Sequence, residues 1–190
     1  RKEASRMNAN RVRIEKLQEE MAAAGMDMYL VSTADFHQSE YVGAYFKVRA
    51  WLSGFTGSAG TGGDKGQRVS LDRRTVFYPG GQELEGTGVT LMKMREEGVP
   101  TVDEFLEKNL LQGSCLGCDG RTISVSQGKA YAEMMEKKQG RFLCQDDLGG
   151  RIWNDRPEMS KEQAFLVDVK YVGRSREEKT GRCPQHHERK

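Results

Sequence analysis

The spacing of hydrophobic residues changes along the chain, and each change predicts a different element. Between residues 11 and 24, four apolar side chains recur at intervals of three and four positions, the spacing of one face of a helix. They are Ile14, Leu17, Met21 and Ala24. Gly25 follows, and glycine is favoured just beyond a helix C-terminus. The next apolar run, MYLVST at 28–33, is short and rich in residues that favour strands, which predicts a buried strand.

The second half of the chain repeats this alternation. Two segments begin with the spacing of a capping box, in which a Ser or Thr precedes a Glu or Gln by three residues and the two side chains bond to each other's backbone N–H. The pairs are Thr101 with Glu104, and Ser124 with Gln127. Short apolar runs predict strands at 68–71, 75–78, 89–94, 115–119 and 141–145. Helices alternating with strands predict an α/β fold, a sheet flanked by helices.

Length and charge limit the classes of function. With 190 residues, of which 36% are hydrophobic, the chain can bury one substantial core. We expect one domain over residues 1–172 and a charged linker over 173–190, leading to a following domain that is missing here. Thirty Lys and Arg against 28 Asp and Glu leave a net charge of +2, too balanced for the basic surface of a nucleic-acid-binding protein. The sequence predicts neither a membrane span nor a secretory signal, because its apolar stretches are short and interrupted.

The four cysteines are too few and too irregularly spaced for a disulfide framework, which favours reduced thiols in a cytosol-like compartment. Cys115 and Cys118 have the C-x-x-C spacing of zinc and redox sites. The residues that could complete a zinc site, Cys183, His186 and His187, lie in the polar tail. We therefore expect Cys115 and Cys118 to bind no metal, with Cys118 in a strand that faces the core.

Residues 35–63 hold the densest group of chemically capable side chains. The glycine-rich segment GFTGSAGTGG lacks the lysine and the spacing of a phosphate-binding loop, so a tight turn between strands is favoured over a nucleotide site. Ser58 lacks the G-x-S-x-G context of a nucleophile. His37 remains as the candidate base, but a histidine beside Asp35 and Glu40 on a loop is more often a hydrogen-bonded structural residue. Catalysis by this chain alone is therefore not expected.

Several sequence blocks, taken in order, carry a family resemblance. They are DFHQSEY, RAWLSGFTGSAGT, TLMKM, GVPTVDEFLEKNL, GCD, IWNDRP and YVGRSREEK. Over about residues 10–178 the chain resembles the first domain of the cytosolic X-Pro aminopeptidases (aminopeptidase P) of the creatinase/prolidase superfamily. The resemblance implies an α/β domain built on a mixed sheet. It also implies that a catalytic site with two manganese ions lies in a separate domain, whose Asp, Asp, His, Glu, Glu ligand set does not occur here.

The resemblance further implies a non-catalytic role in a cytoplasmic enzyme that removes an N-terminal residue preceding proline. The implied partners are a peptide with proline at its second position and the catalytic domain of the same protein, and a homodimer is left open. Neither nucleic acid nor a membrane is among them. The rival hypothesis is a protein-binding module without catalysis, as in the histone-chaperone subunits of the same superfamily. Metal ligands encoded beyond residue 190 would distinguish the two.

One segment departs from the family pattern. The family's TDGRY segment, whose Arg reaches the substrate, corresponds here to LDRRTVFY, so the resemblance implies Arg74 as a substrate-binding residue with Arg73 as its competitor. The Asp-x-Arg spacing from Asp72 is kept. A guanidinium on a rigid turn can dock a peptide carboxylate or carbonyl. His37 is the second expected substrate-binding residue, and we expect it to lie near the GFTGSAGT turn at one end of the sheet, facing the catalytic domain.

Overall fold

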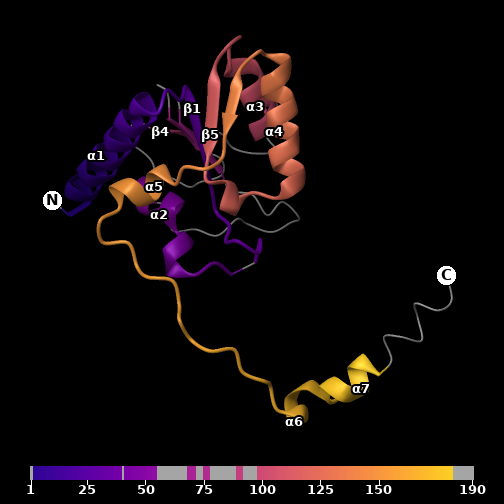
Figure 1. The fold of residues 1–190 in the computed structure, drawn as a ribbon. Helices are drawn as coiled ribbons and strands as arrows, with labels where there is room; N and C mark the ends of the chain where they lie inside the picture. The colour runs from indigo at the N-terminus through magenta and orange to yellow at the C-terminus, as the bar shows by residue number, and fades with distance from the viewer. Residues whose placement is uncertain are drawn as a thin grey trace. The chain divides into compact units, whose positions relative to one another are not determined.

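A computed structural model (Figure 1) describes residues 2–39, 41–54, 68–71, 75–77, 89–91 and 98–181. The chain divides into two compact units, Arg1–Met159 (unit 1) and Ser160–Lys190 (unit 2). The domain limits expected from the sequence, with a boundary after residue 172, stay a prediction. The expected fold class is confirmed, because unit 1 is a mixed sheet with helices on both faces.

The sheet of unit 1 has six strands in the order β4-β3-β2-β1-β5-β6. They are β1 (Met28–Ser32), β2 (Arg68–Leu71), β3 (Thr75–Phe77), β4 (Val89–Leu91), β5 (Cys115–Cys118) and β6 (Arg141–Leu143). β1 pairs antiparallel with β2 and parallel with β5, and β6 continues the parallel half. On the other side β2 pairs antiparallel with β3, and β3 pairs parallel with β4. Each strand matches one of the apolar runs, so the strand predictions are confirmed.

The helices of unit 1 are α1 (Lys2–Ala23), α2 (Val48–Ser53), α3 (Val102–Asn109), α4 (Val125–Lys137) and α5 (Leu148–Ile152). α1 begins well before residue 11, where the apolar pattern starts, because residues 2–10 include strong helix formers and neither glycine nor proline. It ends where expected, since Gly25 has φ of +65°. Ile14, Leu17 and Met21 are all buried, as their spacing predicts.

Both predicted capping boxes are present. In α3 the Glu104 backbone N–H donates to Thr101 Oγ1 at 3.2 Å, and the Thr101 N–H donates to Glu104 Oε2 at 2.7 Å. In α4 the same exchange joins Ser124 and Gln127. Each box satisfies backbone donors that a helix N-terminus otherwise leaves unpaired.

The core forms two layers, one on each face of the sheet. The first layer joins α1, α2 and α5 to the sheet through Leu17, Leu52, Leu148 and Trp153, among others. The second joins α3 and α4 through Leu106, Tyr131 and Met135. Figure 1 shows α1 on one side of the sheet and α3 and α4 on the other. Because both faces are covered, all five residues of β1 are buried, which explains its unbroken apolar run.

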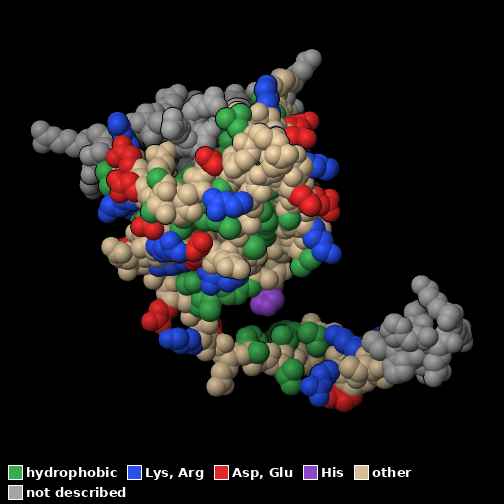
Figure 2. All heavy atoms as spheres, turned by 45° about the horizontal axis from the view of Figure 1, so that its top comes forward, with side chains coloured by type: hydrophobic (Ala, Val, Ile, Leu, Met, Phe, Trp, Pro, Cys, Tyr) green, Lys and Arg blue, Asp and Glu red, His purple; other side chains and the backbone are tan. Residues whose placement is uncertain are grey.

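Unit 2 contains two short helices, α6 (Val169–Val172) and α7 (Arg176–Thr180). It exposes several large apolar side chains, which gather along it in Figure 2. They are Phe165, Leu166, Val167, Val169, Tyr171 and Val172. None of the helices in the described ranges combines the length and the apolar character that a bilayer crossing demands.

Candidate functional site

The chemically capable side chains of unit 1 gather where the parallel strands end. β1, β5 and β6 run in the same direction, so the segments that follow them leave one edge of the sheet together. An antiparallel bridge between Asp119 and Gln145 joins the segments after β5 and β6. We call the group of side chains at this edge the strand-end cluster. Its members are Phe36, Tyr45, Phe46, Asp119, Arg121, Asp147 and Arg156.

Asp147 is the centre of this cluster. Its Oδ2 accepts from Arg156 Nη1 at 2.5 Å and from Arg121 Nη2 at 2.9 Å, while its Oδ1 accepts from the Gly150 N–H at 2.7 Å and so caps α5. Arg121 also makes a bidentate pair with Asp119, with both distances 2.9 Å, and this pairing raises its pKa. Asp147 therefore holds two guanidinium groups and a helix N-terminus in one arrangement.

The two arginines also hold the loop that follows β1. Arg156 donates through Nε to the Tyr45 carbonyl at 2.8 Å and stacks on the Tyr45 ring, with Cζ 3.7 Å from the ring centroid. Arg121 lies over Phe36 at 5.0 Å. The ring of Phe46 makes edge contacts with Phe36 at 4.8 Å and with Tyr45 at 5.0 Å. Cation–π contacts of this kind hold Phe36 against Arg121, which follows β5, and Tyr45 against Arg156, which follows α5.

His37 lies on this fixed loop, but its side chain is exposed. The turn is set by Asp35, whose Oδ1 accepts from the backbone N–H groups of Ser39 and His37, each at 2.9 Å. These hydrogen bonds, with that from Ser39 first, lower the pKa of the Asp35 carboxyl. The loop thus presents the imidazole to the surroundings of unit 1, where it can contact a bound molecule or a second domain.

Two buried polar side chains, Tyr29 and Arg49, join β1 to the segments around it. The Tyr29 hydroxyl donates to the Asp146 carbonyl at 2.7 Å and accepts from the Leu148 N–H at 3.1 Å, and burial raises its pKa. Arg49 of α2 is buried, and its Nε donates to Thr33 Oγ1 just after β1. Burial lowers the pKa of the Arg49 guanidinium to about 10. The edge of the sheet that carries the strand-end cluster is therefore built from interlocked segments.

The cysteines of the C-x-x-C motif point to opposite faces of the sheet. Cys115 belongs to the core layer under α1, and Cys118 to the layer under α3 and α4. Residues three apart in a strand face opposite sides, so the two thiols cannot bind the same metal ion. The prediction that Cys118 faces the core from a strand is confirmed, and burial raises the pKa of the Cys115 thiol. Within the described ranges, no group of three or more His, Cys, Asp and Glu side chains is placed to hold a metal ion.

Several predicted residues lie outside the described part of the chain. They are Ser58, Arg73, Arg74, Cys183, His186 and His187. The expected proximity of His37 and the GFTGSAGT turn lies outside it as well, since only Gly54 of that turn is described. Sequence reasoning did not single out Asp147, Arg121 or Arg156. A signal existed, because Asp119 ends one predicted strand and Asp147 follows another, and sites of α/β sheets form at strand ends.

Comparison with known proteins agrees with the family resemblance seen in the sequence. The family model described as "Creatinase/Prolidase N-terminal domain" matches residues 13–143. Probable Xaa-Pro aminopeptidase P of Talaromyces marneffei is 30% identical over 169 residues, which are 88% of this chain and 26% of that protein. Aminopeptidase P2 of Arabidopsis thaliana is 31% identical over 152 residues, 78% of this chain and 21% of that protein. The chain thus spans about a quarter of the length of these curated relatives.

Among solved structures, an X-prolyl aminopeptidase from Caenorhabditis elegans matches with a TM-score of 0.76. It is described as a cytosolic enzyme with a di-nuclear active site. The match covers 92% of this chain and 30% of that chain at 23% identity, so it shows likeness of fold alone.

Proposed function

Because this chain belongs to the creatinase/prolidase N-terminal domain family, we propose that it is the non-catalytic N-terminal part of a cytoplasmic, metal-dependent X-Pro aminopeptidase. Such an enzyme releases an N-terminal residue that precedes proline. The observation that carries the proposal is the alignment of 88% of the chain with about a quarter of a probable Xaa-Pro aminopeptidase P. Because the chain aligns with only one portion of these longer peptidases, its role in this proposal is to assist the portion that carries out catalysis.

In this proposal the strand-end cluster and the loop 36–46 form a wall of the active site. The loop is held at Phe36 and Tyr45 by two arginines, which makes it a suitable rigid support for the exposed His37. His37 and Arg74 bind the peptide from the side opposite the catalytic residues. The partners are a peptide with proline at its second position and the catalytic domain of the same protein, with a homodimer as a further arrangement.

The catalytic metal belongs to the following domain in this proposal. The Asp, Asp, His, Glu, Glu set that the family resemblance implies does not occur in this sequence, so two manganese ions would be held elsewhere in the polypeptide. The contribution of the present chain is to bind, orient and enclose the peptide. A wall that excludes bulky peptides would restrict cleavage to short, free N-terminal ends.

The test compares this chain with a longer one that includes the following domain, using cleavage of an X-Pro tripeptide with added Mn²⁺. We expect turnover by the longer protein and none by residues 1–190 alone. A mock preparation from cells that do not express the chain, purified in the same way, measures activity from a contaminating metallopeptidase. Metal-dependent cleavage by the 190-residue chain itself, retained through purification, would contradict the proposal.

The role of His37 is tested in the longer protein. His37→Ala should raise KM for the tripeptide and leave the folding of unit 1 intact, because the imidazole is exposed. Tyr41→Ala is the control, because Tyr41 is an exposed residue of the same loop. Equal kinetics for both variants and the unmodified protein would remove His37 from the substrate-binding role.

A further inference from the structure

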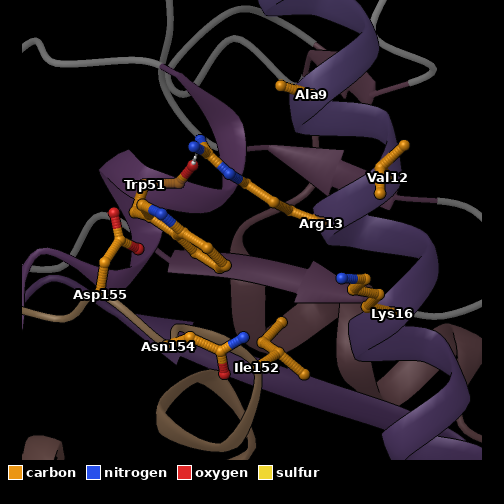
Figure 3. A pocket seen from close by; sticks show the side chains of 8 residues that line it. All are labelled: Ala9, Val12, Arg13, Lys16, Trp51, Ile152, Asn154 and Asp155. Atoms are coloured by element: carbon orange, nitrogen blue, oxygen red, sulfur yellow. Dashed lines mark hydrogen bonds between the residues drawn. The ribbon is translucent and has the colours of Figure 1, made fainter.

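Unit 1 has a groove between α1, α2 and the segment after α5 (Figure 3). Its volume of about 430 Å³ is within the range of small-ligand sites. It is lined by Ala9, Val12, Arg13, Lys16, Trp51, Ile152, Asn154 and Asp155. None of these residues belongs to the strand-end cluster.

The wall of the groove is held rigidly. Trp51 stacks on Trp153, with ring centroids 5.0 Å apart and an interplanar angle of 14°, and the Arg13 guanidinium lies 4.5 Å from the Trp51 ring centroid. Arg13 Nη1 also donates to the Trp51 carbonyl at 2.6 Å and to Asn10 Oδ1 at 3.2 Å. Asn10 in turn donates to the Ser53 carbonyl at 3.1 Å. A site that is already ordered loses little entropy when a ligand binds.

The groove carries cationic donors that the described residues do not use. The hydrogen bonds of Arg13 involve Nη1, and no described residue accepts from its Nε or Nη2. Lys16 lies one turn further along α1, on the same face, and pairs with no carboxylate in the described ranges. In Figure 3 the Lys16 ammonium points into the space between α1 and Asn154. Two adjacent cations favour an anionic group at this end of the groove.

The other residues that line the groove indicate which further groups a ligand should carry. Trp51 and Ile152 offer apolar surface beside the cations, and Val12 is exposed on α1. The Asn154 amide supplies one acceptor and two donors, which match the N–H and C=O of a peptide group. In Figure 3 Asp155 lies on the side of Trp51 away from α1, where its charge opposes a second anionic group.

We infer that this groove binds the C-terminal end of a short peptide. The peptide's carboxylate lies on Arg13 and Lys16, its last side chain contacts Trp51 and Ile152, and its last peptide group pairs with Asn154. This site is separate from the proposed substrate-binding surface at His37, and the inference does not depend on the aminopeptidase proposal.

The chain itself supplies the readout, because its two tryptophans are Trp51 and Trp153. The 190-residue chain is titrated with N-acetyl-Ala-Leu and, separately, with the C-terminal amide of the same dipeptide, while tryptophan emission is recorded. We expect saturable binding of the acid with a dissociation constant on the order of 1 mM or lower, and at least roughly fivefold weaker binding of the amide. Equal binding of acid and amide, or no saturation by about 10 mM, overturns the inference.

Three variants locate the carboxylate. Lys16→Gln should weaken binding of the acid by roughly threefold to tenfold, because it removes a cation beside the proposed carboxylate position. Asp155→Asn should strengthen binding by a smaller factor, because it removes a negative charge from the far side of the same groove. Arg11→Gln is the matched control, since Arg11 is an exposed cation of α1 that pairs with Glu15 and does not line the groove. Far-ultraviolet circular dichroism checks that each variant is folded. If Lys16→Gln binds as Arg11→Gln does, the placement of the carboxylate is wrong and the inference fails.

Discussion

Arg156 lies over the ring of Tyr45, with Cζ 3.7 Å from the ring centroid, and donates from Nε to the carbonyl oxygen of the same residue at 2.8 Å. The two residues are 111 positions apart in the sequence. Arg156 also pairs with Asp147 at 2.5 Å, so a single side chain joins the loop after β1 to the N-terminus of α5. The position of the His37 loop therefore depends on a segment that follows the last strand of the sheet.

Asp147→Asn should release this connection. The asparagine can still accept from the Gly150 N–H, but it lacks the charge that balances Arg156, whose side chain is 10% exposed. Weakening the partner of a largely buried cation should lower the free energy of unfolding by about 1–3 kcal/mol. Chemical unfolding measures this loss. Amide hydrogen exchange should quicken in the loop 36–46 more than in β1.

Asp146→Asn is the matched control for that experiment. Asp146 pairs with Arg151, but both side chains are more exposed, at 32% and 49%, and a pair of this kind contributes little. We expect a change within about 0.5 kcal/mol and no change in loop exchange. If the two variants lose equal stability, Asp147 does not have the special role described for it.

Two glycines should respond in opposite directions to replacement by alanine. At Gly128 in α4 an added Cβ would meet Ile123 Cδ1 at 3.5 Å, an ordinary contact, so alanine should stabilise the helix by about 0.5–1 kcal/mol. At Gly140 the added Cβ would lie 2.4 Å from the Ser114 carbonyl oxygen, and backbone must move, so alanine should destabilise the fold by about 1–3 kcal/mol. Urea unfolding of both variants checks the signs. A stabilised Gly140→Ala variant would show that the close approach of these backbones is wrong.

The Asp35 turn predicts an acid-dependent contribution to stability. Its folded pKa is lowered by hydrogen bonds from the Ser39 and His37 N–H groups, so the stabilisation is present above the unfolded pKa and is lost as pH falls through the folded pKa. Asp35→Asn keeps an acceptor but removes the charge. The difference in unfolding free energy between the two proteins should be constant near neutral pH and shrink below about pH 4. A difference that does not change with pH would contradict this account.

More of the fold than of the candidate site could be predicted from the sequence. Local signals set the elements, since the spacing of Leu17 and Met21 and the capping box at Thr101 depend on residues a few positions apart. The strand-end cluster depends instead on contacts across more than a hundred residues, such as Arg156 with Tyr45, and no local pattern fixes which strands become neighbours. The family resemblance supplied the mixed sheet for the same reason, because it carries the topology that periodicity lacks.

The C-x-x-C motif shows how topology changes the meaning of a local pattern. In a loop, Cys115 and Cys118 could converge on one ion, but in β5 they face different core layers. The predicted strand over 115–119 is therefore enough to exclude a metal ion shared by the two thiols. A motif is best interpreted together with the element that contains it.

Arg74 remains the most specific prediction about substrate binding, and it lies outside the described residues. It rests on the Asp-x-Arg spacing from Asp72, in the segment that joins β2 and β3. If Arg74 holds a carboxylate or carbonyl of the peptide, Arg74→Ala in the longer protein should reduce kcat/KM for a tripeptide by the equivalent of about 1–3 kcal/mol, the usual contribution of a charge-assisted hydrogen bond. The free energy of unfolding, measured by thermal denaturation, should change by no more than about 0.5 kcal/mol, as for most surface substitutions. Arg73→Ala is the control, because it removes the same charge one position earlier. Near-normal kinetics for both variants would end the proposed role, whereas a defect confined to Arg73→Ala would assign the role to the competing arginine.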